Sequence, residues 1–161
     1  MLQQIARPLL TTRSETPSQT HKRQNDRIRS ERAKVEPSAT VMIVDDMEGV
    51  RVVAQMFLEE AGYKVLTASG GQECLDLHSR SPDPIDVVVL DYFMPQMDGA
   101  QTFAALKARD GNVRVILSSG LLGNLRQSQL LQSGVSAILE KPYMPDQLVE
   151  SVRSVLLAKA A

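Results

Sequence analysis

The feature of this sequence that most limits its possible folds is an alternation of short apolar runs and helical periods from Thr40 onward. Val41 to Val44 is a continuous apolar run, typical of a parallel strand covered on both faces. From Val50 to Ala61 the apolar residues recur every three or four positions, the spacing of a helix with one buried stripe. This succession of a strand and a helix then repeats along the chain. Strands are expected at 41–44, 64–68, 85–90, 113–117 and 137–139, and helices at 50–61, 72–78, 100–109, 121–132 and 146–157.

Five strand–helix units joined by short connections predict an α/β fold. We expect a doubly wound five-stranded parallel sheet with helices on both faces, in the flavodoxin-like strand order 2-1-3-4-5. In such a sheet, functional groups gather at the carboxyl ends of the strands. The residues that follow each expected strand are therefore where a site should be sought.

Residues 1–38 differ in composition from the rest of the chain. They carry eight Lys or Arg and four Asp or Glu, a net charge of +4, whereas the whole chain carries −1. They hold few large apolar groups, too few to offset the entropy of ordering. We therefore expect a basic, flexible arm at 1–38, with at most a short helix at 24–35, and a folded domain at 39–161. The arm is either a solvated leader or a docking segment, and its lack of aromatic residues makes DNA binding unlikely.

Several classes of protein are excluded by what the sequence lacks. No apolar run approaches the ~20 residues that a membrane span requires, so no membrane partner is expected. The first residues have no continuous apolar core like that of a secretory signal. A single cysteine, Cys74, excludes an internal disulfide framework and a cysteine-based zinc site. Together these features predict a cytoplasmic protein.

Polar side chains follow four of the five expected strands. Asp45 and Asp46 come after the first strand and Asp91 after the third. Ser119 comes after the fourth and Lys141 after the fifth. Strands 1, 3, 4 and 5 are contiguous in the order 2-1-3-4-5, so these side chains should meet at one edge of the sheet. Any one of them alone is more simply explained as a helix cap, a turn former or a solvated charge; their joint occurrence indicates a site.

The chemistry of this set favours phosphoryl transfer. Three carboxylates held together repel one another unless positive charge joins them. Lys141 can neutralise one charge, and the remainder suits a hard divalent cation; Mg²⁺ fits a site with few protein ligands and several waters. An anionic oxygen beside a metal, a lysine and a hydroxyl is suited to a reaction that depends on positioning and charge neutralisation.

The pattern resembles the receiver domain of two-component response regulators. The resemblance spans about 40–157 and leaves only the arm outside. Its most specific part is the D-x-x-M-P-x-M-D-G stretch that begins at Asp91. The other segments that carry it are Val44-Asp45-Asp46, Ile116-Leu117-Ser118-Ser119-Gly120 and Lys141-Pro142-Tyr143.

This resemblance implies a role for each matching position. Asp91 would accept a phosphoryl group from a histidine kinase or a histidine phosphotransfer protein. Ser119 would be the switch hydroxyl, and Lys141 would pair with the phosphoryl oxygens. The Mg²⁺ ligands would be Asp45, Asp46, Asp91 and the backbone carbonyl of Phe93. Smaller roles are implied for Gly120, whose backbone approaches the phosphoryl group, for Pro142, as a cis-proline, and for Pro95 and Gly99, which shape the loop over the acceptor.

Two departures from the family pattern matter. The switch aromatic usually stands three residues before the lysine, where this chain has Ile138, so an inward swing of an aromatic ring is not assumed. Phe93 and Leu121 occupy positions whose side chains influence the attack of water on the acyl phosphate. Both are apolar and cannot orient a water, which predicts a long-lived phosphoryl state.

We predict a single-domain response regulator that is not an enzyme and that signals through a phosphorylation-dependent conformational switch. Its protein output partner is expected on the face formed by the helix at 121–132, the strand at 137–139 and the helix at 146–157. A phosphorelay intermediate or a kinase-regulating receiver is an open alternative, because the Ser-Ser-Gly and Lys-Pro-Tyr steps resemble receivers of hybrid histidine kinases.

Two rivals from other classes fit the sequence less well. A phosphohydrolase of the haloacid-dehalogenase type also uses an aspartyl phosphate, but it would want a second acid two residues after Asp91, where Phe93 stands. A flavodoxin-like cofactor binder would want a phosphate loop rich in Gly, Ser and Thr after the first strand. The residues there are Asp45-Asp46-Met47.

Overall fold

The computed structural model describes residues 39–120 and 122–158. The predicted arm at 1–38, with its possible helix, and position 121 lie outside the described residues. Within the described part, no helix is long and apolar enough to span a bilayer.

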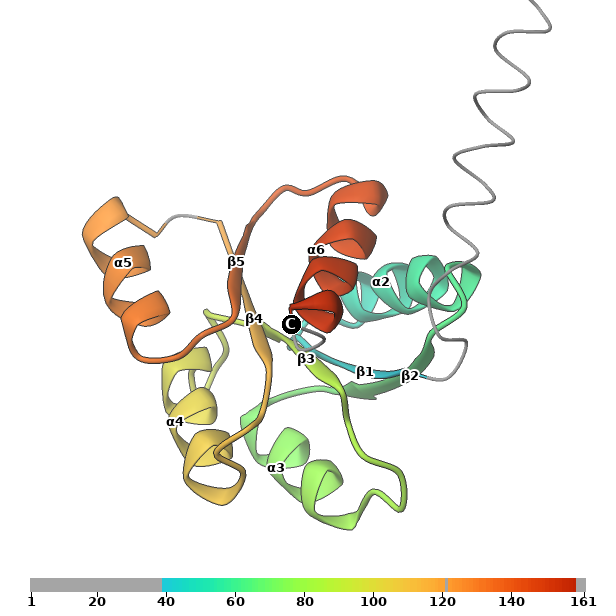
Figure 1. Ribbon diagram of the computed structural model, residues 1–161, viewed down its shortest axis with the longest axis horizontal. Helices are drawn as coiled ribbons and strands as arrows, with labels where there is room; N and C mark the ends of the chain where they lie inside the picture. Colours follow the sequence, from blue (N-terminus) through green and yellow to red (C-terminus); the bar gives the residue numbers. More distant parts are fainter. Residues whose placement is uncertain (1–38, 121, 159–161) are drawn as a thin grey trace, which may run out of the picture. The chain divides into compact units, whose positions relative to one another are not determined.

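The described residues form one parallel sheet with helices between successive strands (Figure 1). The sheet has five strands in the order β2-β1-β3-β4-β5, and every neighbouring pair is parallel. The predicted fold class and strand order are confirmed. The strands are β1 (Thr40–Val44), β2 (Lys64–Ala68), β3 (Val87–Asp91), β4 (Val115–Ser119) and β5 (Ala137–Glu140). The helices are α2 (Glu48–Glu60), α3 (Gly71–Arg80), α4 (Gly99–Arg109), α5 (Asn124–Gln132) and α6 (Pro145–Leu157).

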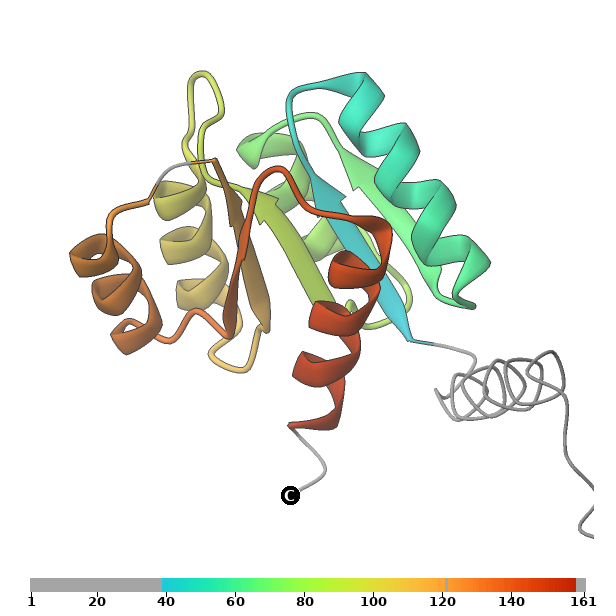
Figure 2. The ribbon, with the colours of Figure 1, turned by 90° about the horizontal axis from the view of Figure 1, so that it is seen from above.

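The helices cover both faces of the sheet, as Figure 2 shows from above. Helices α2 and α6 pack on one face and α3, α4 and α5 on the other. Because successive residues of a strand point to opposite faces, β1 contributes to both cores. Val41 and Ile43 pack with Leu58 and Leu148 on the α2/α6 face, whereas Met42 and Val44 belong to the core that contains Leu75, Phe103 and Leu130.

Strand β4 lies two residues further along the chain than the expected 113–117. The backbone N–H of Val113 donates to the carbonyl of Asp110, so Val113 belongs to the turn after α4. At the other end, Ser118 pairs with β3 and Ser119 pairs with β5. The strand therefore continues through the buried Ser118 and Ser119. The prediction ended at Leu117 because the apolar run ends there.

Helix α5 is shorter than the expected 121–132. It begins at Asn124 after Gly123, which caps the helix without a side-chain hydrogen bond. Of its nine residues only Leu130 is buried. The apolar residues near this helix are thus mostly not core residues, which makes α5 the most shallowly seated helix of the described fold.

Candidate functional site

Three carboxylates meet at the carboxyl ends of β1 and β3. Asp45 and Asp46 directly follow β1, and Asp91 is the last residue of β3. One carboxylate oxygen of each lies within 4.8 Å of the others. Asp45 and Asp91 are buried, whereas Asp46 is exposed. The cluster forms because β1 and β3 are parallel neighbours, so their ends lie side by side.

Lys141 joins two of these acids. Its Nζ donates to Asp45 Oδ2 at 2.6 Å and to Asp91 Oδ1 at 3.0 Å. The backbone N–H of Lys141 donates to the carbonyl of Ser119 at 2.8 Å, which continues the β4–β5 pairing by one residue. The structure thus brings together Asp45, Asp46, Asp91 and Lys141, as expected from their places at the strand ends.

The pKa values of Asp91 and Lys141 are both raised, for different reasons. Burial raises the pKa of Asp91; the hydrogen bond and charge of Lys141 lower it only part of the way back, and the charge of Asp45 raises it again. Burial lowers the pKa of Lys141, but its hydrogen bonds to Asp45 and Asp91 and their charges outweigh this, so the pKa is raised. Lys141 therefore stays protonated, and its single ammonium group faces a cluster of three acids.

This arrangement fits a hard divalent cation. Carboxylate oxygens are the ligands that such cations prefer, and the exposed Asp46 leaves one side open to water. Asp45 already accepts a hydrogen bond on each oxygen, from the Met47 backbone N–H at 2.9 Å and from Lys141 Nζ. Asp46 and Asp91 consequently have the more available oxygens, and Asp45 is better placed to act through a water.

Ser119 supplies a hydroxyl group beside the cluster. Its Oγ is buried and has no hydrogen-bond partner among the described residues. Leaving a buried hydroxyl unpaired costs free energy, so such groups call for an explanation. An anionic oxygen bound at the acid cluster would provide the missing partner.

The loop over the end of β3 depends on Gly99. A Cβ at this position would lie 2.7 Å from the Cα of Tyr92, closer than packed atoms allow. The backbone N–H of Gly99 donates to the Tyr92 carbonyl at 2.9 Å, which folds the loop back on the end of β3. Within the loop, the Met97 N–H donates to the Pro95 carbonyl at 2.7 Å.

The peptide bond from Lys141 to Pro142 is cis.

The family follows from a match over most of the chain. Residues 41–153 match the model of the response regulator receiver domain. This chain belongs to that family. As a receiver it is 36% identical over 128 residues to the response regulator Rre1 of Synechocystis, and the match covers 76% of this chain and 53% of Rre1. It is 30% identical over 122 residues to sporulation initiation phosphotransferase F of Bacillus subtilis, covering 74% of this chain and 95% of that protein.

Solved structures agree with the family assignment. The CheX-CheY-BeF3-Mg²⁺ complex from Borrelia burgdorferi contains a chain that superposes on this receiver with a TM-score of 0.69 and 29% identity. That match covers 73% of this chain and 88% of the other. The receiver thus spans about half of Rre1 and nearly all of phosphotransferase F.

An apolar hollow of about 560 Å³ lies directly beside Lys141. Val50, Val53 and Phe57 of α2 form one wall, and Pro142 and Tyr143 form the other. The sequence did not predict this hollow, because Val50, Val53 and Phe57 were expected on the buried stripe of the helix. In the structure Val53 is 48% exposed and the other two are half-buried, so this part of the predicted stripe faces the hollow.

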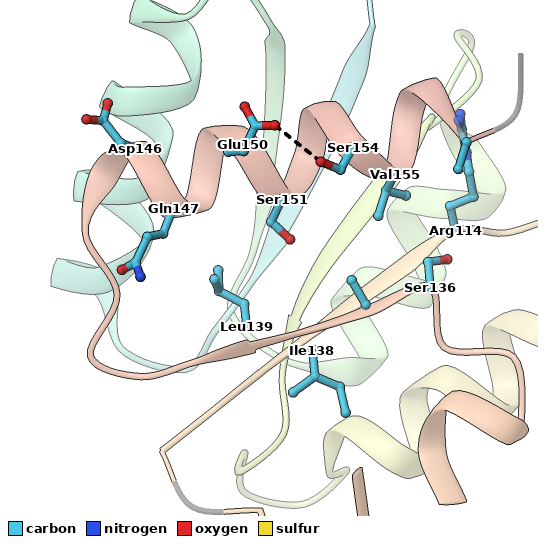
Figure 3. Close-up of a pocket in the computed structure, with 12 residues that line it drawn as sticks. Arg114, Ser136, Ile138, Leu139, Asp146, Gln147, Glu150, Ser151, Ser154 and Val155 are labelled. Carbon is cyan, nitrogen blue, oxygen red and sulfur yellow. Dashed lines mark hydrogen bonds between the residues drawn. The ribbon is translucent and has the colours of Figure 1, made fainter. Parts of the chain in front are cut away.

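A second, larger hollow of about 850 Å³ runs between β5 and α6 (Figure 3). Its lining includes Arg114 and Glu150, and no member of the acid cluster belongs to it. Figure 3 shows Ile138 and Leu139 pointing to opposite sides of β5, with Leu139 toward α6. Ile138 packs with the core on the α5 side. Leu121, the other departure from the family pattern, lies outside the described residues.

Arg51 was not among the predicted site residues. Its Nη1 donates to the backbone carbonyl of Asp45 at 2.6 Å, which ties the first turn of α2 to the acidic loop. An arginine one turn into a helix that follows two acids was a usable signal. Arg51 restrains the backbone of the loop and leaves the carboxylates free.

Proposed function

We propose that this receiver is a response regulator in which Asp91 accepts a phosphoryl group from a histidine kinase or a histidine phosphotransfer protein. One observation carries the proposal: a buried carboxylate at a strand end is bonded to a protonated lysine and lies within 4.8 Å of two further carboxylates. The unpaired Ser119 hydroxyl on the neighbouring strand adds a donor. These parts match the needs of phosphoryl transfer, which are positioning and charge neutralisation.

The transfer is a single displacement at phosphorus. A carboxylate oxygen of Asp91 attacks the phosphorus of the donor's phosphoimidazole, so that a P–O bond forms and the P–N bond breaks. The electron pair of the P–N bond stays on the imidazole nitrogen, which takes up a proton. Lys141 remains protonated and offers its ammonium group to the phosphoryl oxygens, and the Ser119 hydroxyl donates to another.

The proposed metal is Mg²⁺, held by Asp45, Asp46, Asp91 and the backbone carbonyl of Phe93. When bound, the ion neutralises the negative charge of the phosphoryl oxygens. Asp45 holds Lys141 in place through its 2.6 Å bond and would act on the metal through a water. Asp46, which is exposed, would be a direct ligand.

The apolar hollow beside Lys141 supports a helical phosphodonor. A donor histidine must come within bonding distance of Asp91, so the donor must cover the residues around the site. Val53, which lines the hollow, is apolar and 48% exposed. An exposed apolar hollow beside a charged site marks a protein contact. A donor helix with an apolar stripe would fill the hollow and place its histidine over the acids.

The phosphoryl state is proposed to be long-lived, because the side chain of Phe93 is 60% exposed and apolar and cannot orient an attacking water. Output is proposed to pass through the face of α5, β5 and α6, in a single-domain regulator without enzymatic activity of its own. A phosphorelay role remains the alternative, since the match covers 95% of phosphotransferase F.

Intact-mass measurement with Mg²⁺ and acetyl phosphate tests the proposal. The protein should gain one phosphoryl group, and Asp91→Asn should gain none. The matched control is Asp98→Asn, a half-buried acid in the loop after Asp91 whose side chain caps α4, a role that asparagine also fills. An adduct that persists in Asp91→Asn refutes the assignment. Turnover of a phosphate ester without an adduct would support the dehalogenase-type enzyme instead.

A further inference from the structure

The three acids of the cluster are not held equally. Lys141 Nζ bonds the carboxylates of Asp45 and Asp91. The second oxygen of Asp45 accepts from the Met47 backbone N–H. Among the described residues, no hydrogen bond or ion pair ends on the carboxylate of Asp46, which is exposed. The place of Asp46 in the cluster therefore depends on how its backbone is held.

Arg51 bonds the residues on both sides of Asp46. Its Nη1 donates to the Asp45 carbonyl at 2.6 Å, and its backbone N–H donates to the Met47 carbonyl at 3.1 Å. The Asp45 carbonyl and the Asp46 N–H belong to one planar peptide group, so the side-chain bond also sets the orientation of Asp46. Met47 is the N-cap of α2 and makes no side-chain capping bond. Arg51 is thus the side chain that restrains the backbone at this turn.

The surroundings of Arg51 favour this bond. A bond from a guanidinium group is charge-assisted, and 2.6 Å is short for such a bond. Arg51 is half-buried, so water competes with it less than at an exposed position. The Ser69 hydroxyl and N–H bond Glu73 Oε2 at 2.6 and 2.7 Å. These two bonds and, to a smaller extent, the charge of Arg51 lower the pKa of Glu73, against the effect of burial. A fixed carboxylate on α3 therefore attracts the guanidinium.

We propose that Arg51 is a positioning residue for the cation: its bond to the Asp45 carbonyl holds Asp46 where the Asp46 carboxylate can bind Mg²⁺ together with Asp91. The inference rests on the proposed function, in which the acid cluster binds Mg²⁺. In the described part of the chain, no ion pair joins Arg51 to an acid of the cluster. Arg51 therefore acts on the metal through the backbone.

The charge of Arg51 and its positioning role have opposite effects on cation affinity. A guanidinium near three carboxylates repels a divalent cation, so removal of its charge alone would strengthen Mg²⁺ binding. Loss of the bond that orients Asp46 would weaken it, because groups that orient metal ligands typically contribute about 10- to 100-fold to affinity. The direction of the change in affinity therefore separates the two effects.

Isothermal titration calorimetry of the full chain with Mg²⁺ alone tests the inference. Arg51→Ala should bind Mg²⁺ on the order of ten-fold more weakly than the wild type. Arg51→Lys keeps the charge but has one compact donor group in place of the planar fork. Its affinity should lie between those of Arg51→Ala and the wild type. Circular dichroism under the titration conditions verifies that each variant is folded.

Arg80→Ala is the matched control for the loss of charge. Arg80 is exposed and is the last residue of α3. Because α3 leads from the carboxyl end of β2 back to the start of β3, Arg80 lies away from the acid cluster. This variant should bind Mg²⁺ as the wild type does. An equal weakening by Arg80→Ala and Arg51→Ala would contradict the positioning role.

Labelling by acetyl phosphate, read by intact mass, gives a second readout. In Arg51→Ala the Mg²⁺ concentration that gives half-maximal labelling of Asp91 should rise by the same factor as the Kd for Mg²⁺. The labelling rate at saturating Mg²⁺ should match that of the wild type, because Arg51 does not touch the reacting atoms. A rate that stays low at saturating Mg²⁺ would contradict a role limited to positioning the metal ligand.

The wild type distinguishes the possible failures. If it binds Mg²⁺ and is labelled on Asp91, but Arg51→Ala binds Mg²⁺ equally or more tightly, the positioning role is refuted and the proposed function stands. If the wild type binds no Mg²⁺, the proposed metal site and the role of Arg51 are both refuted. If it binds Mg²⁺ but takes up no phosphoryl group, the proposed function of Asp91 fails and the titration still decides the role of Arg51.

Discussion

Helices α5 and α6 flank the same strand, β5, yet they are held by different forces. Helix α6 packs with α2 through side chains that are fully or almost fully buried, and its position is set by apolar area removed from water. Helix α5 has one buried side chain and two exposed polar contacts with the rest of the fold, Arg126 with Tyr92 and Gln127 with Glu140. Burial has no preferred direction and is insensitive to a nearby charge. A hydrogen bond is directional, and a new charge can break it.

This contrast assigns different tasks to the two sides of the receiver. The hollow proposed for the donor is formed by α2 and the loop that leads into α6, so its shape should persist whether or not Asp91 is phosphorylated. The α5 side is loosely attached and is tied to the chain neighbours of Asp91 and Lys141. The proposed donor surface is thus attached through buried apolar packing, whereas the first turn of α5 is attached through polar contacts.

The largest expected effect tests whether α6 is packed more firmly than α5. Leu148→Ala empties a fully buried position on α6 and should lower the free energy of unfolding by about 3–5 kcal/mol. Leu130→Ala on α5 should lower the free energy of unfolding by about 2 kcal/mol. Leu130 is 6% exposed, and the shallowly packed helix can move to fill part of the cavity. Urea unfolding followed by circular dichroism measures both. Equal costs would show that α5 is packed as firmly as α6.

The next effect concerns the apolar hollow proposed to bind the phosphodonor. Val53→Asp places a charge in the apolar hollow and should slow phosphotransfer from the cognate donor protein about ten-fold or more, the loss typical of a central interface residue. Val52→Asp is the matched control: Val52 is 57% exposed on the same helix and does not line the hollow. Labelling by acetyl phosphate should be unchanged in both. Equal slowing by the two variants would place the donor elsewhere.

The third prediction concerns the lifetime of the phosphoryl group on Asp91. Phe93→Asn gives the loop a side chain that can orient a water, and loss of the phosphoryl group should accelerate by roughly ten-fold, less than full general-base catalysis provides. Decay of the intact-mass adduct after removal of acetyl phosphate measures this. Phe93→Leu keeps the position apolar and should leave the rate as it is. An unchanged rate in Phe93→Asn counts against a long-lived state controlled by this residue.

The smallest effect tests how much the contact between Arg126 and Tyr92 contributes to stability. Arg126→Ala should lower the global free energy of unfolding by less than about 1 kcal/mol, because it removes exposed contacts only. Urea unfolding of this variant beside Leu148→Ala makes the comparison direct. A loss as large as that of the core variant would mean that Arg126 supports the fold itself.

Much of the architecture could be predicted because it depends on local pattern. The run Val41 to Val44 is buried throughout, and the period on α2 identifies a helix although only Ala54 and Leu58 of its stripe are buried. The alternation of such elements leaves few topologies. The acid cluster followed from the same rule, since neighbouring parallel strands bring their ends together. The end of β4 was predicted wrongly, because buried hydroxyls extend a strand without extending its apolar run.

The sequence by itself determined the order of the strands, the family and which residues meet at the strand ends, because these depend on periodicity and on a specific motif. Only the tertiary structure decided that Arg126 reaches Tyr92, 34 residues away, and that Gln127 reaches Glu140. Exposed polar side chains follow no periodic pattern, and their partners depend on how a helix is seated on the sheet. That seating is decided by packing between elements distant in the chain, which no local stretch of sequence encodes.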